Sequence, residues 1–245
     1  MAKKGERKQQ KRMSVESVRK LAKKEAVFTL RSRAGPHSKS TSVPLGFALR
    51  DLMGLTRTSR ETRILLMQNG VIVNGTVRKN AGFPVGLFDL VDVMQLKKRF
   101  RAIFDRKGRI EFIEADFKQK PVKLSRIVGK KTVKSGIIQL ATNDGFVLKE
   151  KKTNIRVGDT VRISLPDKKI EESYELKEGN TAFIVGGVRA GAIARIKEII
   201  PGTIRKPKLI RLEQGSEVFE TVDRNVFIVG RKEPAIDITV GGAKK

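Results

Sequence analysis

The spacing of apolar residues predicts two short helices between residues 44 and 70. In VPLGFALRDLMG, apolar residues recur at i, i+3, i+4 and i+7 from Leu45 to Leu52, with Pro44 near the first helical position. In TSRETRILLMQNG, Thr58 and Glu61 have the spacing of a capping box, which favours a helix start at this point. The predicted apolar stripe of this second helix comprises Ile64, Leu65 and Met67.

Most of the remaining pattern is typical of short β-strands. VIVNGTVR holds two β-prone runs around Asn74-Gly75, a strong hairpin signal, and LFDLVDVMQ predicts a later strand. Further strands are predicted in FRAIFDRKGRIEFIEADF, GIIQLATNDGFVLKE, IRVGDTVRISL, LIRLEQGSEVFET and NVFIVG. The acidic stretch DKKIEESYELKE predicts a solvated connector instead. Short strands at this spacing indicate a small barrel or sandwich.

These patterns predict an α+β, multi-domain fold, because 245 residues are enough for more than one domain. Near the N-terminus, SVESVRKLAKKEAVF predicts a short helix with Ser14 as its N-cap. We expect five parts: a basic N-terminal extension (1–42), a unit of two helices and a short sheet (43–95), a central β-rich domain (96–172), a small β-barrel (173–231) and a C-terminal tail (232–245).

The net charge of the chain indicates which class of molecule it binds. The chain has 53 Lys and Arg against 26 Asp and Glu, a formal net charge of +27 and an isoelectric point near 10.6. An excess of this size is typical of a protein that binds a polyanion, and nucleic acid is the first candidate. A membrane partner is not expected, because no apolar run approaches the length of a spanning helix. The polar N-terminus also lacks the apolar core of a secretory signal.

The residue inventory argues against enzyme chemistry. There is no cysteine and one histidine, which excludes a thiol nucleophile, a disulfide framework and a Cys/His zinc site. His37 in RAGPHSKS cannot form a metal site alone, and we expect a loop histidine that makes a structural or a phosphate-facing hydrogen bond. We therefore expect no catalytic residue, no metal, no cofactor and no small-molecule substrate.

The stretch TAFIVGGVRAGAIARI carries three glycines beside two arginines, and such glycines often let a backbone approach a phosphate. A dinucleotide loop would need G-x-G-x-x-G between a strand and a helix. The spacing here is G-G-x-x-x-G, and the following AIARIKEIIPG is short and ends at a proline. Two interpretations stay open: a structural turn that needs glycine, or a loop that brings Arg189 to an RNA backbone.

Several of these stretches resemble known modules. RILLMQNGVIVNGTVRKN, followed by DLVDV, resembles the αL RNA-binding module of some ribosomal proteins and RNA-modifying enzymes. TAFIVGGVRAGAIARI resembles a KOW motif, with Gly191 at the characteristic loop glycine and Ala194 where a second glycine often occurs. Further stretches carry the same resemblance and follow one another along the chain in this order: AGPHSKS, VPLGFALRD, GFPVGLFDLVDV, FDRKGR, IRVGDTVRISL and NVFIVGR. The chain from about 25 to 231 is thus identified as a member of the small-subunit ribosomal protein S4e family.

The resemblance implies an αL module at 43–95, a central β domain and a C-terminal SH3-like KOW barrel, without enzymatic activity. It implies a cytoplasmic protein of the ribosome that binds and braces folded small-subunit ribosomal RNA through Lys/Arg–phosphate contacts and touches neighbouring ribosomal proteins. The chain ends soon after NVFIVGR, without a basic extension, so an archaeal type is expected. The alternatives are an RNA-modifying enzyme with an appended RNA-binding module and a KOW-type regulator of transcription or translation.

The RNA-binding candidates follow from the charge pattern. Arg57, Arg60 and Arg63 recur every three residues, away from the predicted apolar stripe. Aromatic residues are only 5% of the chain, which favours recognition of shape and backbone over base stacking as the main mode. The full set of candidates comprises Lys3, Lys4, Arg7, Lys8, Arg12, Arg33, His37, Lys39, Arg50, Arg57, Arg60, Arg63, Arg78, Lys79, Lys97, Lys98, Lys130, Lys131, Arg189, Gly191 and Arg195.

Overall fold

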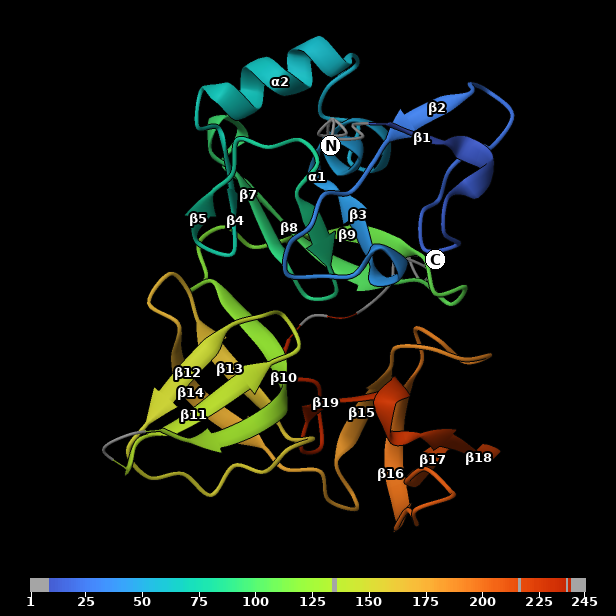
Figure 1. Ribbon diagram of the computed structural model, residues 1–245, viewed down its shortest axis with the longest axis vertical. Coiled ribbons are helices and arrows are strands. Elements are labelled where there is room, and N and C mark those ends of the chain that lie inside the picture. The colour runs from blue at the N-terminus through green and yellow to red at the C-terminus, as the bar shows by residue number, and fades with distance from the viewer. Residues whose placement is uncertain (1–8, 134–135, 216, 237, 239–245) are drawn as a thin grey trace, which may run out of the picture. The chain divides into compact units, whose positions relative to one another are not determined.

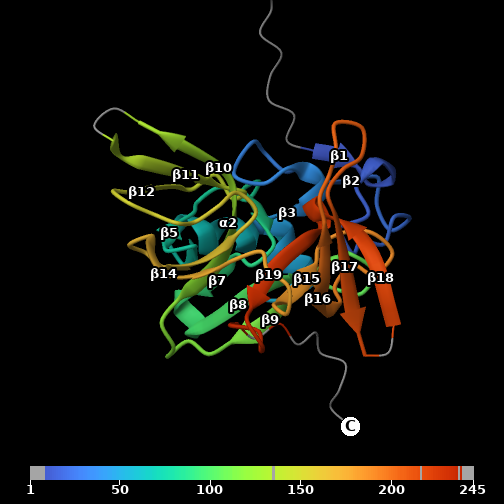
Figure 2. The same cartoon turned by 90° about the horizontal axis from the view of Figure 1, so that it is seen from below.

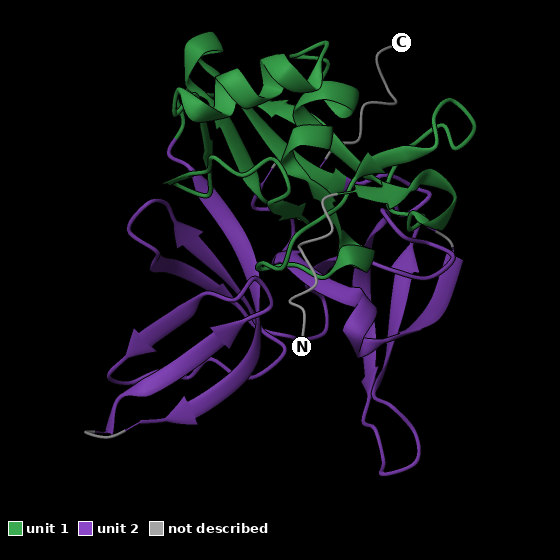
Figure 3. Ribbon diagram, turned by 45° about the horizontal axis from the view of Figure 1, so that its top comes forward, with its two compact units in different colours: residues 1–103, 109–119 green, residues 104–108, 120–245 purple. Residues whose placement is uncertain are grey.

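The computed structural model of this chain describes residues 9–133, 136–215, 217–236 and 238. The chain forms two compact units, which Figure 3 shows in two colours. Unit 1 comprises residues 1–103 and 109–119, and unit 2 comprises residues 104–108 and 120–245. Both units are mostly β, and helices are few and short in the described residues.

Unit 1 is built on a five-stranded antiparallel sheet in the order β5-β4-β7-β8-β9. Two smaller two-stranded sheets, β1-β2 and β3-β6, belong to the same unit. The strands are β1 (Gln9–Lys11), β2 (Phe28–Leu30), β3 (Ser42–Pro44), β4 (Val71–Val73), β5 (Thr76–Val77), β6 (Pro84–Gly86), β7 (Leu90–Val93), β8 (Lys98–Phe104) and β9 (Ile110–Ala115). The strands β8 and β9, which we expected in the central domain, thus extend the sheet of unit 1.

The two predicted helices of unit 1 are confirmed. Helix α1 (Leu45–Phe47) continues into a wider, π-type turn (Ala48–Leu52), and Gly54 follows with a positive φ of 65°. Helix α2 (Ser59–Met67) starts at the predicted capping box. Figure 1 shows the two helices together at the top of unit 1. Short 3-10 turns also occur, at Arg12–Ser14, Lys39–Thr41, Met94–Leu96 and Asp223–Asn225.

The predicted apolar stripe of α2 is wrong for Ile64 and Met67, whereas Leu65 is half-buried. The helix buries Thr62 and Leu66, whereas Ile64 is 49% exposed and Met67 is 68% exposed. Thr62 can lie inside because its hydroxyl donates to the Thr58 carbonyl at 3.0 Å and lies 2.7 Å from the Thr56 hydroxyl. A threonine whose hydroxyl is satisfied behaves as an apolar residue, so hydrophobicity alone selected the wrong face.

The predicted helix beginning at Ser14 is also wrong. The chain makes only a 3-10 turn at Arg12–Ser14 and then runs through turns as far as β2. The carbonyl of Val18 accepts from the backbone N–H of Ile110 at 2.9 Å, so it is engaged outside any helix. Arg19 is buried and donates to the Leu30 carbonyl and to the Ser32 hydroxyl. Tertiary contacts therefore replace the local helix.

The hairpin at Asn74-Gly75 is confirmed between β4 and β5. Both turn residues have positive φ, 50° and 75°, as a two-residue hairpin loop of the favoured hand requires. Asn74 is also buried, and its side chain donates to Asp89 at 2.8 Å and accepts from the Leu90 N–H at 3.0 Å. The turn is therefore tied to the start of β7.

Unit 2 contains two five-stranded antiparallel sheets, in the orders β12-β11-β10-β13-β14 and β18-β17-β16-β15-β19 (Figure 2). Their strands are β10 (Val122–Thr132), β11 (Ile138–Thr142), β12 (Val147–Glu150), β13 (Thr160–Ser164), β14 (Lys169–Tyr174), β15 (Thr181–Ile184), β16 (Ile193–Ile200), β17 (Leu209–Gln214), β18 (Glu217–Val222) and β19 (Val226–Gly230). The strand predictions for this half of the chain are confirmed.

The connector predicted in DKKIEESYELKE is wrong, because its centre forms β14 and pairs with β13. This strand lies at the edge of its sheet, where charged side chains reach water without burying a charge. The core of the first sheet is formed by aliphatic residues of β10 to β13 and the loop before β13: Ile127, Leu140, Leu148, Ile155, Val161 and Ile163.

The described helices are short, since the longest, α2, has nine residues. Among the described residues, no helix combines the length and apolarity needed to cross a membrane.

Candidate RNA-binding surface

The capping box of α2 sets the direction of its arginines. The Thr58 hydroxyl accepts from the Glu61 N–H at 3.2 Å, and the Glu61 carboxylate accepts from the Arg57 N–H at 2.8 Å. These two bonds satisfy backbone donors that the first turn leaves without helical partners. With Thr62 and Leu66 turned inward, Arg57, Arg60 and Arg63 are left exposed.

Glu61 is held in its charged form. The N–H of Arg57 and then the hydroxyl of Thr58 donate to the carboxylate, and together they lower the pKa of Glu61 below its ordinary value of 4.5. Hydrogen bonds to the charged form of a carboxyl favour that form. The single carboxylate of this helix is thus committed to its N-terminus and does not neutralise Arg60 or Arg63, neither of which forms an ion pair in the described structure.

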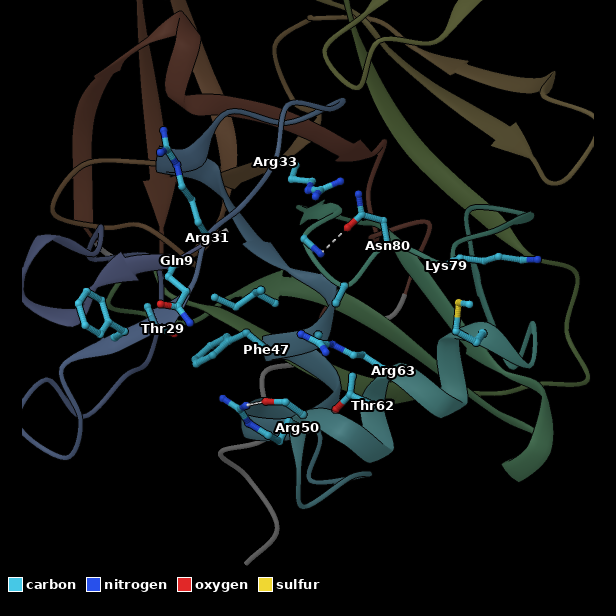
Figure 4. A pocket seen from close by; sticks show the side chains of 17 residues that line it. Gln9, Thr29, Arg31, Arg33, Phe47, Arg50, Thr62, Arg63, Lys79 and Asn80 are labelled. Atoms are coloured by element: carbon cyan, nitrogen blue, oxygen red, sulfur yellow. Dashed lines mark hydrogen bonds between the residues drawn. The ribbon is translucent and has the colours of Figure 1, made fainter. Parts of the chain in front are cut away.

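A cavity of about 650 Å³ lies in unit 1 beside this arginine face. Figure 4 shows its side chains coming from β2, the segment after β2, α1, α2 and the segment after β5. Five of the lining residues are cationic and none is acidic: Arg31, Arg33, Arg50, Arg63 and Lys79. We call this the basic cavity. Arg50 is paired with Asp51 at 2.7 Å, and the excess positive charge that remains favours an anionic ligand.

Backbone hydrogen bonds hold the walls of the basic cavity. The N–H of Gly46 donates to the Ala81 carbonyl at 2.7 Å, and the N–H of Arg33 donates to the Gly82 carbonyl at 2.8 Å. The Asn80 side chain accepts from the Gly82 N–H at 3.0 Å, as the dashed line in Figure 4 shows. The segment after β5 is therefore fixed both to α1 and to the segment after β2.

Sequence reasoning missed several of the residues that line this cavity. Arg31 was not a candidate, although Arg31 and Arg33 stand two residues apart directly after β2, a spacing that places side chains on one face of an extended segment. Phe28, Met67 and Asn80 were missed because none of them is charged. Arg33, Arg50, Arg63 and Lys79 were candidates, and the structure brings them together.

His37 lies in a buried network, with 6% of its side chain exposed. Its Nε2 is 3.0 Å from Asp89 Oδ2, and Asp89 also accepts from Asn74 Nδ2 and from the Gly86 N–H, both at 2.8 Å. A Cβ on Gly86 would lie 2.5 Å from the His37 ring, so glycine makes room for it. Of the two interpretations left open for His37, the structural hydrogen bond is the one observed.

The loop between β15 and β16 is packed against its own unit. A Cβ on Gly191, whose φ is 79°, would lie 2.5 Å from the Asp105 carbonyl oxygen. Arg189 Nη1 is 2.5 Å from Glu217 Oε2, and its guanidinium lies 4.5 Å from the centre of the Phe219 ring. Gly191 therefore has a packing role, and Arg189 already has an internal partner.

Other candidates divide by whether they have an internal partner. Arg12 is buried and paired with Glu25, Arg78 lies over the Phe83 ring, and Lys98 is paired with Glu114. Lys130 donates to two carbonyls of the 153–155 loop. Exposed candidates for which the described structure gives no hydrogen bond or ion pair of the side chain are Lys39, Lys97, Lys131 and Arg195. Lys3, Lys4, Arg7 and Lys8 lie outside the described residues.

The described chain contains no group of three or more His, Cys, Asp or Glu side chains placed to hold a metal ion. Acidic side chains are mostly engaged singly, with an arginine, a lysine or a backbone N–H.

Comparison with known proteins finds similarity to ribosomal proteins. The Ribosomal family S4e matches residues 96–170. Small ribosomal subunit protein eS4 of Methanosphaera stadtmanae is 36% identical over 238 residues, which covers 97% of this chain and 98% of that protein. The eS4 protein of Archaeoglobus fulgidus is 33% identical over 234 residues, covering 94% and 98%. The crystal structure of the 30S ribosomal protein S4e from Thermoplasma acidophilum is similar with a TM-score of 0.67 and 27% identity, covering 78% of this chain and 95% of that one.

Proposed function

The chain belongs to the S4e family of ribosomal proteins, and on this premise we propose that it binds and braces folded ribosomal RNA in the small subunit. The family consists of structural proteins of the ribosome, so the chain is a ribosomal protein and not an enzyme, and its place is the ribosome in the cytoplasm. Its relatives are named as small ribosomal subunit proteins, which supports that subunit as the place of assembly. Neighbouring ribosomal proteins are its further partners.

One observation carries the proposal of RNA contact: the exposed arginines of α2 adjoin a cavity lined by five cations and no carboxylate. Arg60, Arg63 and Lys79 are exposed, and exposed cations contribute little to folding, so these three side chains have no evident structural purpose. Against a phosphate backbone, each of these charges releases a condensed counterion and so contributes to binding. Arg60 and Arg63 are therefore the first phosphate contacts that we propose, with Arg57 beside them.

We propose that RNA binding is divided among separate modules of the chain. Residues 43–95 act as an αL-type RNA-binding module, with its two helices and hairpin, and residues 173–231 act as an SH3-like KOW barrel around the β15–β16 loop. The basic extension (1–42), a central β part that begins at β10 because β8 and β9 belong to the sheet of unit 1, and the tail (232–245) complete the chain. Lys39, Lys97, Lys131 and Arg195 are further phosphate contacts in this proposal.

The experiment is salt-dependent binding to the organism's own small-subunit ribosomal RNA. Arg57, Arg60 and Arg63 are replaced together by Ala, and log Kd is measured against log salt concentration. Removing three phosphate contacts should weaken binding and reduce the slope by about 2 to 3. Arg211→Ala is the control, since that side chain is paired with Glu198 and Glu220. A triple variant with wild-type affinity and slope would refute phosphate contact by this face.

Sedimentation tests the place of action separately. The protein should accompany the small subunit in stoichiometric amount at moderate salt and leave it at high salt. A protein found mainly in the soluble fraction, or with RNA polymerase, would contradict the ribosomal role and favour a regulator of transcription or translation.

A further inference from the structure

The basic cavity has an apolar side that phosphate contacts do not explain. Phe28 and Met67 line it and are 52% and 68% exposed, and Leu30 and Ala81 line it as well. Ligand cavities are typically lined by apolar side chains together with a few polar groups. The ligand must therefore have an apolar face as well as negative charge.

A second observation concerns Thr29, which lines the same cavity. Its side chain is buried, with the residue 6% exposed, and its hydroxyl oxygen has no hydrogen-bond partner in the structure. Buried hydroxyls are almost always hydrogen-bonded, because an unmade bond costs free energy. The hydroxyl oxygen is itself buried beside the cavity, so a ligand group that hydrogen-bonds to it needs a small shift of the wall that covers it.

We propose that the basic cavity holds one unpaired nucleotide of the bound RNA, with its base turned out of the helical stack. A base is flat, has apolar faces and polar edges, and is attached to a phosphate. Bases splayed from loops and bulges are recognised by stacking on aromatic side chains or on arginine planes and by hydrogen bonds to their edges. A cavity of about 650 Å³ has the size of a small-ligand site, which spans about 300 to 1,000 Å³.

The lining side chains divide naturally among the parts of a nucleotide. Phe28 and Met67 supply apolar contact for the base. Of the side chains labelled in Figure 4, Thr29 and Asn80 supply hydrogen bonds to its edge, and Arg63 and Lys79 supply charge for the flanking phosphates. This inference rests on the proposed RNA binding and adds the class of RNA element: a single-stranded bulge, loop or junction nucleotide. A fully paired helix presents no base to such a cavity.

The test combines variants with matched controls on the organism's small-subunit ribosomal RNA. Phe28→Ala and Met67→Ala should each weaken binding about 5- to 100-fold, as loss of a base stack does, with the salt slope unchanged. Val27→Ala and Met13→Ala are the controls, because these residues are 66% and 68% exposed and do not line the cavity. Thr29→Val, which keeps the shape and removes the hydroxyl, should weaken binding less, about 5-fold.

The two proposals fail in different ways. If the arginine triple variant lowers the salt slope but Phe28→Ala and Met67→Ala bind like their controls, the nucleotide pocket is refuted and the phosphate contacts stand. If no variant changes affinity or slope, both are refuted. Circular dichroism of every variant shows whether a loss of RNA affinity reflects unfolding. If Phe28→Ala unfolds and Thr29→Val does not, the RNA affinity of Thr29→Val decides whether the nucleotide pocket stands.

Photocrosslinking identifies what enters the cavity. Phe28 is replaced by the photoreactive p-benzoylphenylalanine, the complex with ribosomal RNA is irradiated, and the crosslinked nucleotide is mapped by reverse-transcription stops. A single crosslink to an unpaired nucleotide supports the proposal, and a crosslink to a base-paired helix refutes it. Free AMP, GMP, CMP and UMP are tested as competitors, and micromolar binding of one of them without RNA would make the cavity a site for a free nucleotide instead.

Discussion

Replacing Gly191 with alanine separates a packing role for the β15–β16 loop from a role in RNA contact. The new Cβ would lie 2.5 Å from the carbonyl oxygen of Asp105, 2.6 Å from its carbonyl carbon and 2.9 Å from the Arg106 nitrogen. These three atoms belong to backbone and cannot move aside as a flexible side chain can. The residue also has a φ of 79°, which alanine adopts only with strain.

The expected loss of stability in Gly191→Ala follows from the strained φ and from the clash with the Asp105 backbone. The positive φ costs roughly 1–2 kcal/mol of unfolding free energy, and the overpacking against the Asp105 backbone costs roughly 1–3 kcal/mol more. Gly187→Ala is the matched control in the same loop, because its φ is 96° but its Cβ would meet nothing nearer than 3.8 Å. The control therefore loses only the first term. At roughly 2–4 °C per kcal/mol, we expect Tm to fall by about 4–20 °C for Gly191→Ala and by about 2–8 °C for Gly187→Ala.

Thermal unfolding followed by circular dichroism measures both variants, and RNA binding is measured below the transition. Gly191→Ala should bind RNA with an affinity close to that of the wild type while it is folded. Equal Tm losses in the two variants would refute the close approach to Asp105. A Gly191→Ala variant with unchanged Tm and weakened RNA binding would restore the interpretation of this glycine as part of an RNA-contacting loop.

Three further outcomes are expected. Asp89→Ala should lower the free energy of unfolding by about 2–5 kcal/mol in urea titration, because it leaves buried donors unpaired, and Asp89→Asn, which keeps an acceptor, should lose less. Lys123→Met should lose about 3–5 kcal/mol, because it leaves the buried Asp144 carboxylate without its cationic partner at 2.8 Å and with only the Ser125 hydroxyl as a donor among the described residues, and adding Asp144→Leu should restore most of the loss; a double variant no better than the single would contradict this. Glu61 has a lowered pKa in the folded state, so its stabilisation is present above its ordinary value of 4.5 and is lost as the pH falls through the folded pKa; Glu61→Gln should therefore show a flatter decline of Tm with acid, and an identical decline would refute the capping contribution.

Local features of unit 1 were predictable because their signals lie within a few residues. The capping box of α2 needs only Thr58 and Glu61, and the hairpin needs only Asn74-Gly75 and its flanking β-prone runs. In each case the sequence neighbours are also the physical partners. The failures occurred where partners are distant, as at Val18, whose carbonyl bonds to Ile110 rather than to the next helical turn.

The candidate site was predictable in its charge and not in its shape. The arginine period on α2 and the absence of competing carboxylates could be read directly, and they indicated an RNA-facing surface. Phe28 and Thr29 carry no such signal, since a phenylalanine and a threonine in a strand are ordinary. Their significance depends on where β2 lies in unit 1 and on what it leaves exposed or unpaired.

Composition and local pattern by themselves predicted a polyanion-binding protein, and they determined its short strands, two short helices and the cap of α2, because net charge and residue periodicity need no knowledge of contacts. Tertiary structure decided which cations have internal partners. Arg12 and Arg189 were RNA-binding candidates by their charge, yet each is paired with a glutamate 13 or 28 positions away, and the candidate His37 bonds to Asp89, 52 positions away. Such pairings depend on the folded path of the chain, since the energy of a charge depends on what the fold places beside it.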